Sequence, residues 1–333
     1  MAAARAGRSA VDGDEQSFRL LVEPHRGRLH AHCYRMLGSA HDADDALQET
    51  LLRAWRGLPN FEGRSSSRAW LYRIATNTCL TMMERRPRRV LRLDGSGPAD
   101  PREDPGEASM ESVWLGPYDE DSWVESPATR YDQRESLELA FVAALQHLPA
   151  RQRAVLILRD VLGFSGAEVA EILDTAPSSV YSLLQRAHRA VDDRIPDVSQ
   201  QETLRTLGDE RVRTLAARYV RAWEAADTDA LVALLAEDAL MTMPPRPAWY
   251  RGRDAVRAFV AGKPMAAGRR WQLVPARANG QLAFGVYGWD HRREAFLPHG
   301  LQVLTLSGDA RIAEITAFLD PALPARFRLP DEL

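Results

Sequence analysis

The segment FSGAEVAEILDTAPSSVYSLLQRAHRAV (164–191) constrains the fold most strongly, because it predicts two short helices joined by a tight turn. Ser165 and Glu168 have the spacing of a capping box, which starts a helix. Pro177 favours a turn or a first helical position, because proline lacks a backbone donor. The second helix has one apolar face at steps of four, three and four: Val180, Leu184, Ala187 and Val191.

The opposite face of the second predicted helix is rich in hydrogen-bond donors and has no acid before Asp192. It carries Ser179, Tyr181, Ser182, Gln185, Arg186 and Arg189. A small helix pair with such a face suits the major groove of DNA, where side chains of these types read base edges. An ordinary helical hairpin with a solvated polar side is the alternative, and the rest of the chain has to decide between them.

Composition excludes several classes of protein. The 333 residues predict about two or three domains, and an apolar content of 45% is that of a globular protein. Cys33 and Cys79 are the only cysteines, which excludes a disulfide framework. No apolar run approaches the roughly 18 residues that span a bilayer, and the N-terminus lacks the apolar core of a signal peptide. We therefore expect a cytoplasmic protein with no membrane partner.

The net charge of −3 hides a division along the chain. Residues 1–90 carry 15 Arg against 10 acidic residues, a net charge of +5. Residues 91–134 carry 4 Arg against 11 acidic residues, a net charge of −7, and are rich in Pro and Gly. This composition predicts an acidic linker. Its aromatic residues Trp114, Tyr118 and Trp123 indicate that it docks on a folded domain, and a solvated tether is the alternative.

Residues 16–90 are predicted to be helical, with the clearest helix from Asp42 to Trp55. A loop at residues 57–67 and a following helix combine aromatic and arginine residues. Such a surface suits single-stranded nucleic acid, because bases stack on the rings while arginines hold phosphates. The alternative is that the aromatic residues belong to the core: Trp55, Trp70 and Tyr72.

The character of the chain changes near Asp209. Amphipathic helices come first, and four strand-like runs follow at residues 269–278, 281–289, 301–306 and 311–320. Helices followed by antiparallel strands predict an α+β domain. The expected domains are a tail at 1–15, a helical domain at 16–90, the linker at 91–134, a second helical domain at 135–196, a linker at 197–208, the α+β domain at 209–325 and a tail at 326–333.

The α+β domain offers acid–base groups, but no catalytic pair can be justified among Asp238, Asp290, His291, His299, Glu314 and Asp320. We therefore expect no enzyme activity and no cofactor. A pocket could be lined by Trp223, Met241, Met243, Trp249, Trp289 and Phe318, although residues of these types are also typical of a plain core. No metal site is expected at His25, His30, His32 and Cys33, because their spacing does not place them on one helical face.

The order of these blocks resembles a bacterial RNA polymerase sigma factor of the extracytoplasmic-function (ECF) group, in the sigma-70 family. HDADDALQETLLRAW (41–55) resembles the region 2 helix that grips the polymerase clamp. FEGRSSSRAWLYRIATNTC (61–79) resembles the loop and helix that open and read the −10 element. The segment from LPARQRAV to QRAHRAV (148–191) resembles the region 4 helices that read the −35 element.

The C-terminal part resembles a SnoaL-like domain of the nuclear-transport-factor-2-like cone fold. WYRGRDAVRAFV (249–260) is similar to a mid-domain helix of that family, and RIAEITAFLDP (311–321) to its last strand. The implied fold is therefore two all-α sigma domains, a region 2 helical bundle and a region 4 helix-turn-helix, followed by an α+β cone-shaped domain.

The resemblance also implies partners and a function. A sigma factor binds core RNA polymerase, through its β′ clamp helices and β flap, and binds promoter DNA to initiate transcription. The C-terminal domain is expected to regulate this activity in cis, with a small molecule as a candidate ligand. Its contact with the linker is expected to use arginines on one side of a helix: Arg211, Arg213, Arg218 and Arg221.

Site residues follow from the resemblance position by position. The core polymerase contacts would be Asp45, Gln48, Glu49 and Leu52. The −10 contacts would be Phe61, Gly63, Arg64, Ser65 and Asn77. The −35 contacts would be Ser179, Tyr181, Ser182, Gln185, Arg186 and Arg189, with Arg153 on the DNA backbone.

Two other functions use the same helix-turn-helix. One is a ligand-responsive transcription regulator that acts without core polymerase, and the other is an enzyme with a DNA-binding head. The helix from Asp42 to Trp55 discriminates against the first, because a repressor has no use for a clamp-binding surface. The second would need a catalytic constellation that the sequence does not offer.

Overall fold

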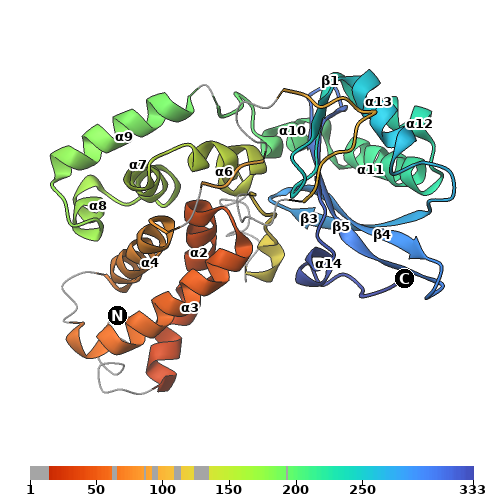
Figure 1. Cartoon of the computed structure of the whole chain (residues 1–333). Coiled ribbons are helices and arrows are strands. Elements are labelled where there is room, and N and C mark those ends of the chain that lie inside the picture. The colour runs from red at the N-terminus through yellow and green to blue at the C-terminus, as the bar shows by residue number, and fades with distance from the viewer. Residues whose placement is uncertain are drawn as a thin grey trace. The chain divides into compact units, whose positions relative to one another are not determined.

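The computed structural model describes residues 15–61, 66–85, 88–91, 97–108, 114–123, 135–192 and 194–333. The chain divides into two compact units. The first takes in Met1–Arg89 and Trp123–Pro196, and the second takes in Val90–Ser122 and Asp197–Leu333. In Figure 1 the first unit is helical, whereas the second is built on a sheet.

The first unit consists of helices that pack against one another. They are α2 (Glu15–Leu37), α3 (Ala40–Gly57), η1 (Leu58–Asn60), α4 (Ser67–Met83), η3 (Glu135–Leu137), α6 (Leu139–Gln146), α7 (Ala150–Leu156), the π-helical turn η4 (Ile157–Val161), α8 (Gly166–Ile172) and α9 (Pro177–Val191). Helix α3 contains the predicted helix from Asp42 to Trp55, and Ser39 caps it by accepting a hydrogen bond from the Asp42 N–H at 3.2 Å. The three-helix bundle of α2, α3 and α4 confirms the expected region 2 domain.

Helices α8 and α9 form the predicted helix-turn-helix. Both halves of the capping box are present: the Ser165 N–H donates to Glu168 Oε2 at 2.7 Å, and the Glu168 N–H donates to Ser165 Oγ at 3.3 Å. Helix α9 begins at Pro177, where the missing backbone donor costs nothing. Its apolar face is buried at Val180, Ala187 and Val191.

Polar contacts hold the two helical domains of the first unit together. The Arg35 guanidinium donates to the Ser136 carbonyl oxygen at 3.1 Å and to its hydroxyl at 2.7 Å. On the other side, the Arg68 guanidinium on α4 donates to the Leu162 carbonyl and lies 4.1 Å from the ring centroid of Phe164, just before α8. The −10-like helix and the helix-turn-helix are therefore packed side by side.

The second unit is built on a six-stranded sheet in the order β2-β1-β6-β5-β4-β3. Its strands are β1 (Leu235–Thr242), β2 (Trp249–Arg251), β3 (Trp271–Ala278), β4 (Gln281–Asp290), β5 (Ala295–Leu306) and β6 (Ile312–Phe318). Its helices are η2 (Glu120–Ser122), α10 (Gln200–Leu207), α11 (Asp209–Glu224), α12 (Thr228–Val232), α13 (Arg253–Gly262) and α14 (Leu323–Arg326). The α+β class is confirmed, and the four predicted strands pair antiparallel as β3, β4, β5 and β6. β1, which was not predicted as a strand, pairs parallel with β6.

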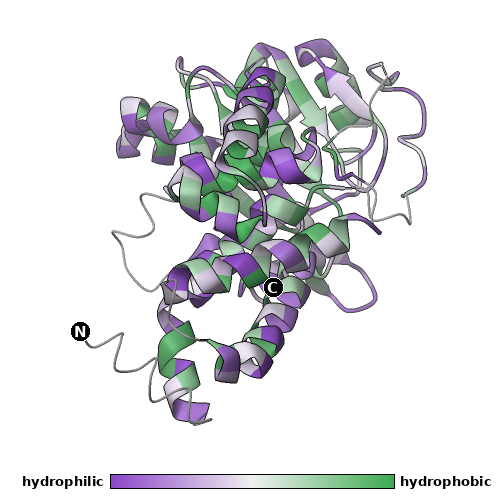
Figure 2. Ribbon diagram, turned by 90° about the vertical axis from the view of Figure 1, so that its left-hand side faces the viewer, coloured by the Kyte–Doolittle hydropathy of each residue, from purple (hydrophilic) through white to green (hydrophobic). Residues whose placement is uncertain are grey.

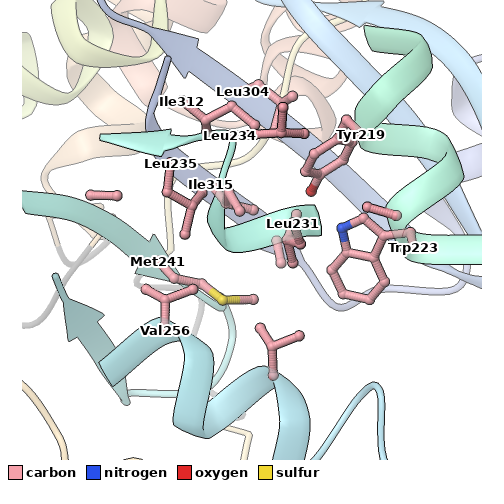
Figure 3. Close-up of a cluster of buried hydrophobic side chains, with 14 of the residues drawn as sticks. Tyr219, Trp223, Leu231, Leu234, Leu235, Met241, Val256, Leu304, Ile312 and Ile315 are labelled. Carbon is pink, nitrogen blue, oxygen red and sulfur yellow. The ribbon is translucent and has the colours of Figure 1, made fainter. Parts of the chain in front are cut away.

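The two faces of the sheet are covered by different segments. Phe284 and Val286 of β4 point into the main apolar cluster, which Figure 3 shows between the sheet, α11 and α13. Tyr287, the next residue of opposite orientation, donates from its hydroxyl to the Pro330 carbonyl at 2.8 Å. A Cβ atom on Gly285 would lie 2.5 Å from Leu329 Cδ1. Residues 326–333, expected as a tail, therefore belong to the fold, because they cover this second face.

Residues 197–208, expected as a linker, contain α10 instead. Ser199 caps this helix by accepting a hydrogen bond from the Glu202 N–H at 3.1 Å. Gln200 then pairs with the backbone of Leu306 on β5, donating to its carbonyl at 2.7 Å and accepting from its N–H at 2.8 Å. Glutamine mimics a backbone strand partner here, which polar composition alone does not reveal.

Hydrophilic and hydrophobic residues alternate along the helices, as the colours of Figure 2 show. In the described residues, no helix combines the length and the apolar character required to cross a membrane.

Candidate functional site

Helix α3 presents a mixed acidic and apolar face. Asp45 and Gln48 are exposed, Glu49 is half-buried, and Leu52 is 46% exposed. Glu49 forms an ion pair with Arg53 at 2.6 Å, one helical turn away. Trp55, three residues after Leu52, is 38% exposed as well, so the two side chains form an apolar area with a polar rim, as at protein-contact surfaces. The structure therefore places all four predicted polymerase contacts on one accessible face.

The predicted −10 residues are only partly described. Gly63, Arg64 and Ser65 lie outside the described residues. Phe61 is half-buried, and its ring centroid lies 4.7 Å from that of Trp70 on α4. Asn77 is exposed on the same helix. Phe61 in the loop and Trp70 on α4 thus form an aromatic pair. Asn77 remains available to a nucleic acid.

Tyr72, Trp55 and Trp70, for which a core position and a nucleic-acid-binding surface were both considered, differ in burial. Tyr72 is a core residue with 1% exposure, and its burial raises its pKa to about 12. Trp55 is 38% exposed and contacts Phe18 edge-on, with ring centroids 5.1 Å apart. Trp70 is half-buried. Only the two tryptophans keep surface that a base or a partner protein could cover.

Helix α9 carries the predicted −35 face as an accessible row. Its exposed members are Tyr181, Ser182, Gln185, Arg186 and Arg189, and Ser179 is half-buried. Tyr181 is 60% exposed but leans over α8, because a Cβ atom on Gly166 would lie 3.2 Å from its hydroxyl oxygen. His188 bonds to Asp160 Oδ2 at 2.6 Å and anchors the side of α9 to the preceding π-helical turn. The row offers donors and two guanidinium groups with no acid among them.

Arg153 is buried between the two helical domains in this arrangement, so its expected contact with the DNA backbone stays a prediction. The residue is 4% exposed, and its guanidinium donates to the Met36 carbonyl and to Gln146 Oε1 at 2.6 Å. Burial, together with the charge of Arg88, lowers the pKa of Arg153 to about 9. In this arrangement Arg153 ties the start of α7 to the end of α2, because its hydrogen bonds go to carbonyl groups of the protein.

The acidic linker docks on the second unit. At its C-terminal part the Tyr118 N–H donates to Asn279 Oδ1 at 2.9 Å, and the Asn279 N–H returns a bond to the Tyr118 carbonyl at 2.9 Å. The Gly280 N–H donates to Glu120 Oε1 at 3.0 Å. Tyr118 is 1% exposed, so its ring adds apolar burial to these polar contacts. Residues 118–120 of the linker therefore dock on the turn between β3 and β4.

The N-terminal part of the linker lies at the opposite edge of the sheet. The Ala99 N–H donates to the Trp249 carbonyl of β2 at 2.9 Å, and the Arg246 guanidinium donates to the Gly106 carbonyl. In Figure 1 this stretch runs beside the strands of the second unit. Val90 and Trp114 form a β-bridge that closes the linker into a loop. The predicted docking is present, and its polar partners among the described residues include Arg246, Trp249, Asn279, Gly280 and Arg328.

A cavity in the second unit includes part of the predicted pocket. Of the six predicted residues, Trp223, Met241 and Met243 line it. Trp249 instead has its ring beside Arg251, and Trp289 stacks under Arg270, while Phe318 is a buried core residue. The polar lining includes His299, which was named from the sequence only as an acid–base group. Sequence reasoning missed its other polar members, Asp104, Arg246, Lys263, Arg269 and Gln302. The arginine and lysine positions follow loops and turns, so no periodic pattern marked them.

One cluster of metal-ligand types occurs in the described residues, at His41, Asp42 and Asp45. Asp42 is already neutralised by Arg89, whose guanidinium donates to it at 2.5 Å. The cluster is explained as a helix start with a buried ion pair.

Comparison with known families divides the chain in the same way as the fold. Sigma-70 region 2 matches residues 21–89, Sigma-70 region 4 matches residues 138–191, and a SnoaL-like domain matches residues 216–315.

Individual relatives extend this likeness. The chain is 43% identical over 336 residues to the ECF RNA polymerase sigma factor SigG of Mycobacterium tuberculosis, covering 99% of this chain and 89% of SigG. It is 30% identical over 186 residues to the ECF RNA polymerase sigma-E factor of Haemophilus influenzae, covering 55% of this chain and 89% of that protein. The crystal structure of the ECF sigma factor SigJ of Mycobacterium tuberculosis matches with a TM-score of 0.59 at 22% identity, over 92% of this chain and 98% of SigJ.

Proposed function

The chain belongs to the ECF group of sigma-70-family RNA polymerase sigma factors, and from this premise we propose how its surfaces divide the work. Helix α3 binds core polymerase at the β′ clamp helices, α4 with the preceding loop reads the −10 element, and α9 reads the −35 element. Region 4 also provides the contact with the β flap. The SnoaL-like domain regulates these activities in cis.

The observation that carries this assignment is the face of α3. Leu52 and Trp55, three residues apart on α3, are 46% and 38% exposed, and Asp45, Gln48 and Glu49 lie beside Leu52. Two large apolar side chains that neighbour each other in water, with polar groups around them, favour a protein-contact surface. The family membership and this face together disfavour the ligand-responsive repressor or activator.

The closed first unit has to open before it can read a promoter. The −35 and −10 elements lie about 25 base pairs apart, which is about 85 Å at roughly 3.4 Å per base pair. Helix α8 packs directly against α4, and α9 is joined to α8 by a short turn. Both reading helices therefore lie far too close together to reach both elements at once. We infer that the contact of Arg68 with Leu162 and Phe164 breaks on engagement with polymerase.

Regulation by the SnoaL-like domain is supported by the linker. The linker joins the −10 domain to the −35 domain, so its reach limits how far they separate. The second unit holds this linker at both edges of its sheet, through Ala99, Gly106, Tyr118 and Glu120. Anything that changes this docking changes the freedom of the two promoter-reading domains.

The experiment that tests the α3 assignment is charge reversal at Asp45 and Glu49. Both groups are accessible, and exposed charges change the free energy of unfolding by less than about 0.5 kcal/mol. The Asp45→Lys/Glu49→Lys variant should stay folded but lose binding to purified core polymerase in a pull-down. The matched control is Glu23→Lys/Glu84→Lys, which reverses two exposed acids elsewhere in the same bundle.

The control should bind as well as the parent chain. Core binding by the α3 variant that equals that of the control would remove this surface from the polymerase contact and reopen the alternative of a regulator that acts without polymerase.

A further inference from the structure

The second unit contains a cavity of about 520 Å³. This size falls within the roughly 300–1,000 Å³ of small-molecule sites. Its floor is apolar and is formed by Trp223, Met241, Met243, Phe259, Trp271 and Val286. Figure 3 shows Trp223 on α11 and Met241 on β1 at different sides of the apolar cluster. The floor can accommodate the hydrophobic body of an organic molecule.

The charged side chains that the sheet domain contributes to the cavity lining are all positive. Arg246, Lys263 and Arg269 line the cavity, and no Asp or Glu of the sheet domain does so. His299 lines it as well, with its ring edge-on to Trp271 at 5.0 Å between centroids. Partial burial, then Arg269 and Arg246, lower the pKa of His299, although much of the residue remains accessible. Three cationic groups around an apolar floor favour a ligand that carries negative charge.

Two further polar groups are donors. The Gln302 side-chain oxygen already accepts the Tyr219 hydroxyl at 2.7 Å, which leaves its NH₂ group as the polar atom for a ligand. The indole N–H of Trp223 is buried and finds no acceptor in hydrogen-bonding geometry among the described residues, although the Tyr219 hydroxyl is near. A ligand oxygen placed beside this N–H would give it a better acceptor.

The acidic residue that lines this cavity, Asp104, belongs to the linker. Asp104, Pro105 and Ala108 complete the lining, and we call residues 104–108 the strap. The Arg246 guanidinium donates to the Gly106 carbonyl and lies 4.0 Å from the Asp104 carboxylate. Gly106 has a φ of +83°, and a Cβ atom there would lie 3.0 Å from Pro247 Cγ, so the strap is closely seated.

We propose that this cavity binds a small amphipathic organic anion, and that the strap occupies its anion position in the free protein. The ligand's carboxylate or similar anionic group binds Arg246 and replaces its contacts with Gly106 and Asp104. The apolar body of the ligand packs on the cavity floor. Binding then releases the strap from the sheet domain. This last step deepens the proposed cis regulation and rests on it, whereas the binding itself does not.

The strap is suited to displacement because its charged contact, the ion pair of Asp104 with Arg246, is weak. The Asp104 side chain is 81% exposed, and a separation of 4.0 Å from Arg246 is at the limit of an ion pair. Exposed pairs of this kind contribute little to stability. A free anion that also buries apolar surface on the cavity floor therefore competes effectively with Asp104.

The test uses matched pairs of probes on the full chain. Benzoate, 2-naphthoate and decanoate are each compared with their neutral amides by isothermal titration calorimetry. At least one anion should bind about tenfold more tightly than its amide, as expected for a charge-assisted hydrogen bond to Arg246. Hydrogen exchange of residues 99–108 should become faster when that anion is bound.

Variants separate the roles of cavity and strap. Arg246→Gln should lose about tenfold in affinity for the anion but not for the amide, whereas Arg251→Gln, an exposed arginine outside the lining, should lose nothing. Asp104→Asn should raise anion affinity about two- to fivefold by removing the competitor. Gly106→Ala should do the same by unseating the strap without changing any charge.

Equal affinity for every anion and its amide, or no binding of either, would overturn the anion site. Anion binding that Asp104→Asn and Gly106→Ala leave unchanged would overturn the role of the strap. Calorimetry needs neither polymerase nor promoter, so these failures would leave the sigma factor assignment intact. Conversely, loss of that assignment in the pull-down would not remove a measured anion site.

Discussion

His32 shows how a single buried residue makes the first unit sensitive to acid. Its ring is fully buried, and Nε2 lies 3.0 Å from the Thr76 hydroxyl. Burial, together with the charge of Arg35, lowers the pKa of His32 to about 3. Between pH 6.5 and 3 the unfolded chain therefore binds a proton that the folded chain does not bind. Stability must fall as the pH falls through this window, by about 1.4 kcal/mol for each pH unit.

We predict that His32→Gln removes most of this pH dependence, because glutamine can still bond to Thr76 but does not titrate. Hydrogen exchange of α2 and α4 at pH 4.5, 5.5 and 6.5, corrected for intrinsic rates, measures the opening free energy. The exposed His41, changed to Gln, is the control and should keep the parental slope. A variant with the same slope as the parent would show that another group carries the acid sensitivity.

At the residue scale, sequence reasoning succeeded where a side chain and its hydrogen-bond partners are close in the sequence. Ser165 and Glu168 have their partners within three residues, so the spacing alone predicted the capping box. The burial of Arg153 was not foreseen for the opposite reason. One of its partners is the Met36 carbonyl oxygen, 117 residues earlier in the chain, and a contact at that separation carries no local signal.

At the scale of elements, we predict that two arginines of α9 have different roles, one in the recognition of bases and the other in the binding of phosphates. Arg186 and Arg189 are both exposed on the donor-rich row. Arg186→Ala should lose about 1–3 kcal/mol of binding to a matched −35 duplex and little on a scrambled one, if it contacts a base edge. Arg189→Ala should weaken both equally and reduce the salt dependence of binding, as a phosphate contact does.

Fluorescence anisotropy with the two duplexes, at several salt concentrations and with core polymerase present, makes this measurement. An equal loss on matched and scrambled duplexes for Arg186→Ala would assign it to the backbone instead. Ser182→Ala serves as a further comparison, because its hydroxyl already donates to the Ser178 carbonyl within α9.

Elements with a clear period were predictable, and elements defined by their partners were not. The four predicted runs became β3, β4, β5 and β6, and β4 is buried on both faces at residues 283–287. β1 was missed because its sequence, LAEDALMT, follows a helical stretch without a turn signal. Its pairing with β6 is parallel and long-range, which no local pattern encodes. The cavity followed the same rule, since its apolar floor was partly predicted and its cationic rim was not.

At the scale of the whole molecule, the docked linker limits how far the promoter-reading domains can separate. The bridge between Val90 and Trp114 closes the intervening chain into a loop. While it holds, the reach of residues 114–135 is at most about 70 Å at roughly 3.3 Å per residue, whereas the released linker could reach about 150 Å. Trp123 stacks on His30 of α2, with ring centroids 3.8 Å apart, and this contact reduces the reach as well. The contacts of Tyr118 and Glu120 with the β3–β4 turn shorten this reach further. We therefore propose that the docked linker favours the closed first unit.

Asn279→Gly tests this coupling with minimal disturbance. Asn279 has a φ of +55°, which glycine adopts without strain, so the variant removes the acceptor of the Tyr118 N–H while keeping the turn. We predict several-fold higher transcription from a cognate promoter with core polymerase, and faster hydrogen exchange of residues 114–122. Ala310→Gly is the control, because it changes another residue of positive φ, 61°, in the β5–β6 turn. If exchange becomes faster but transcription matches the control, the linker is released without effect, and regulation by the SnoaL-like domain must act through a different contact.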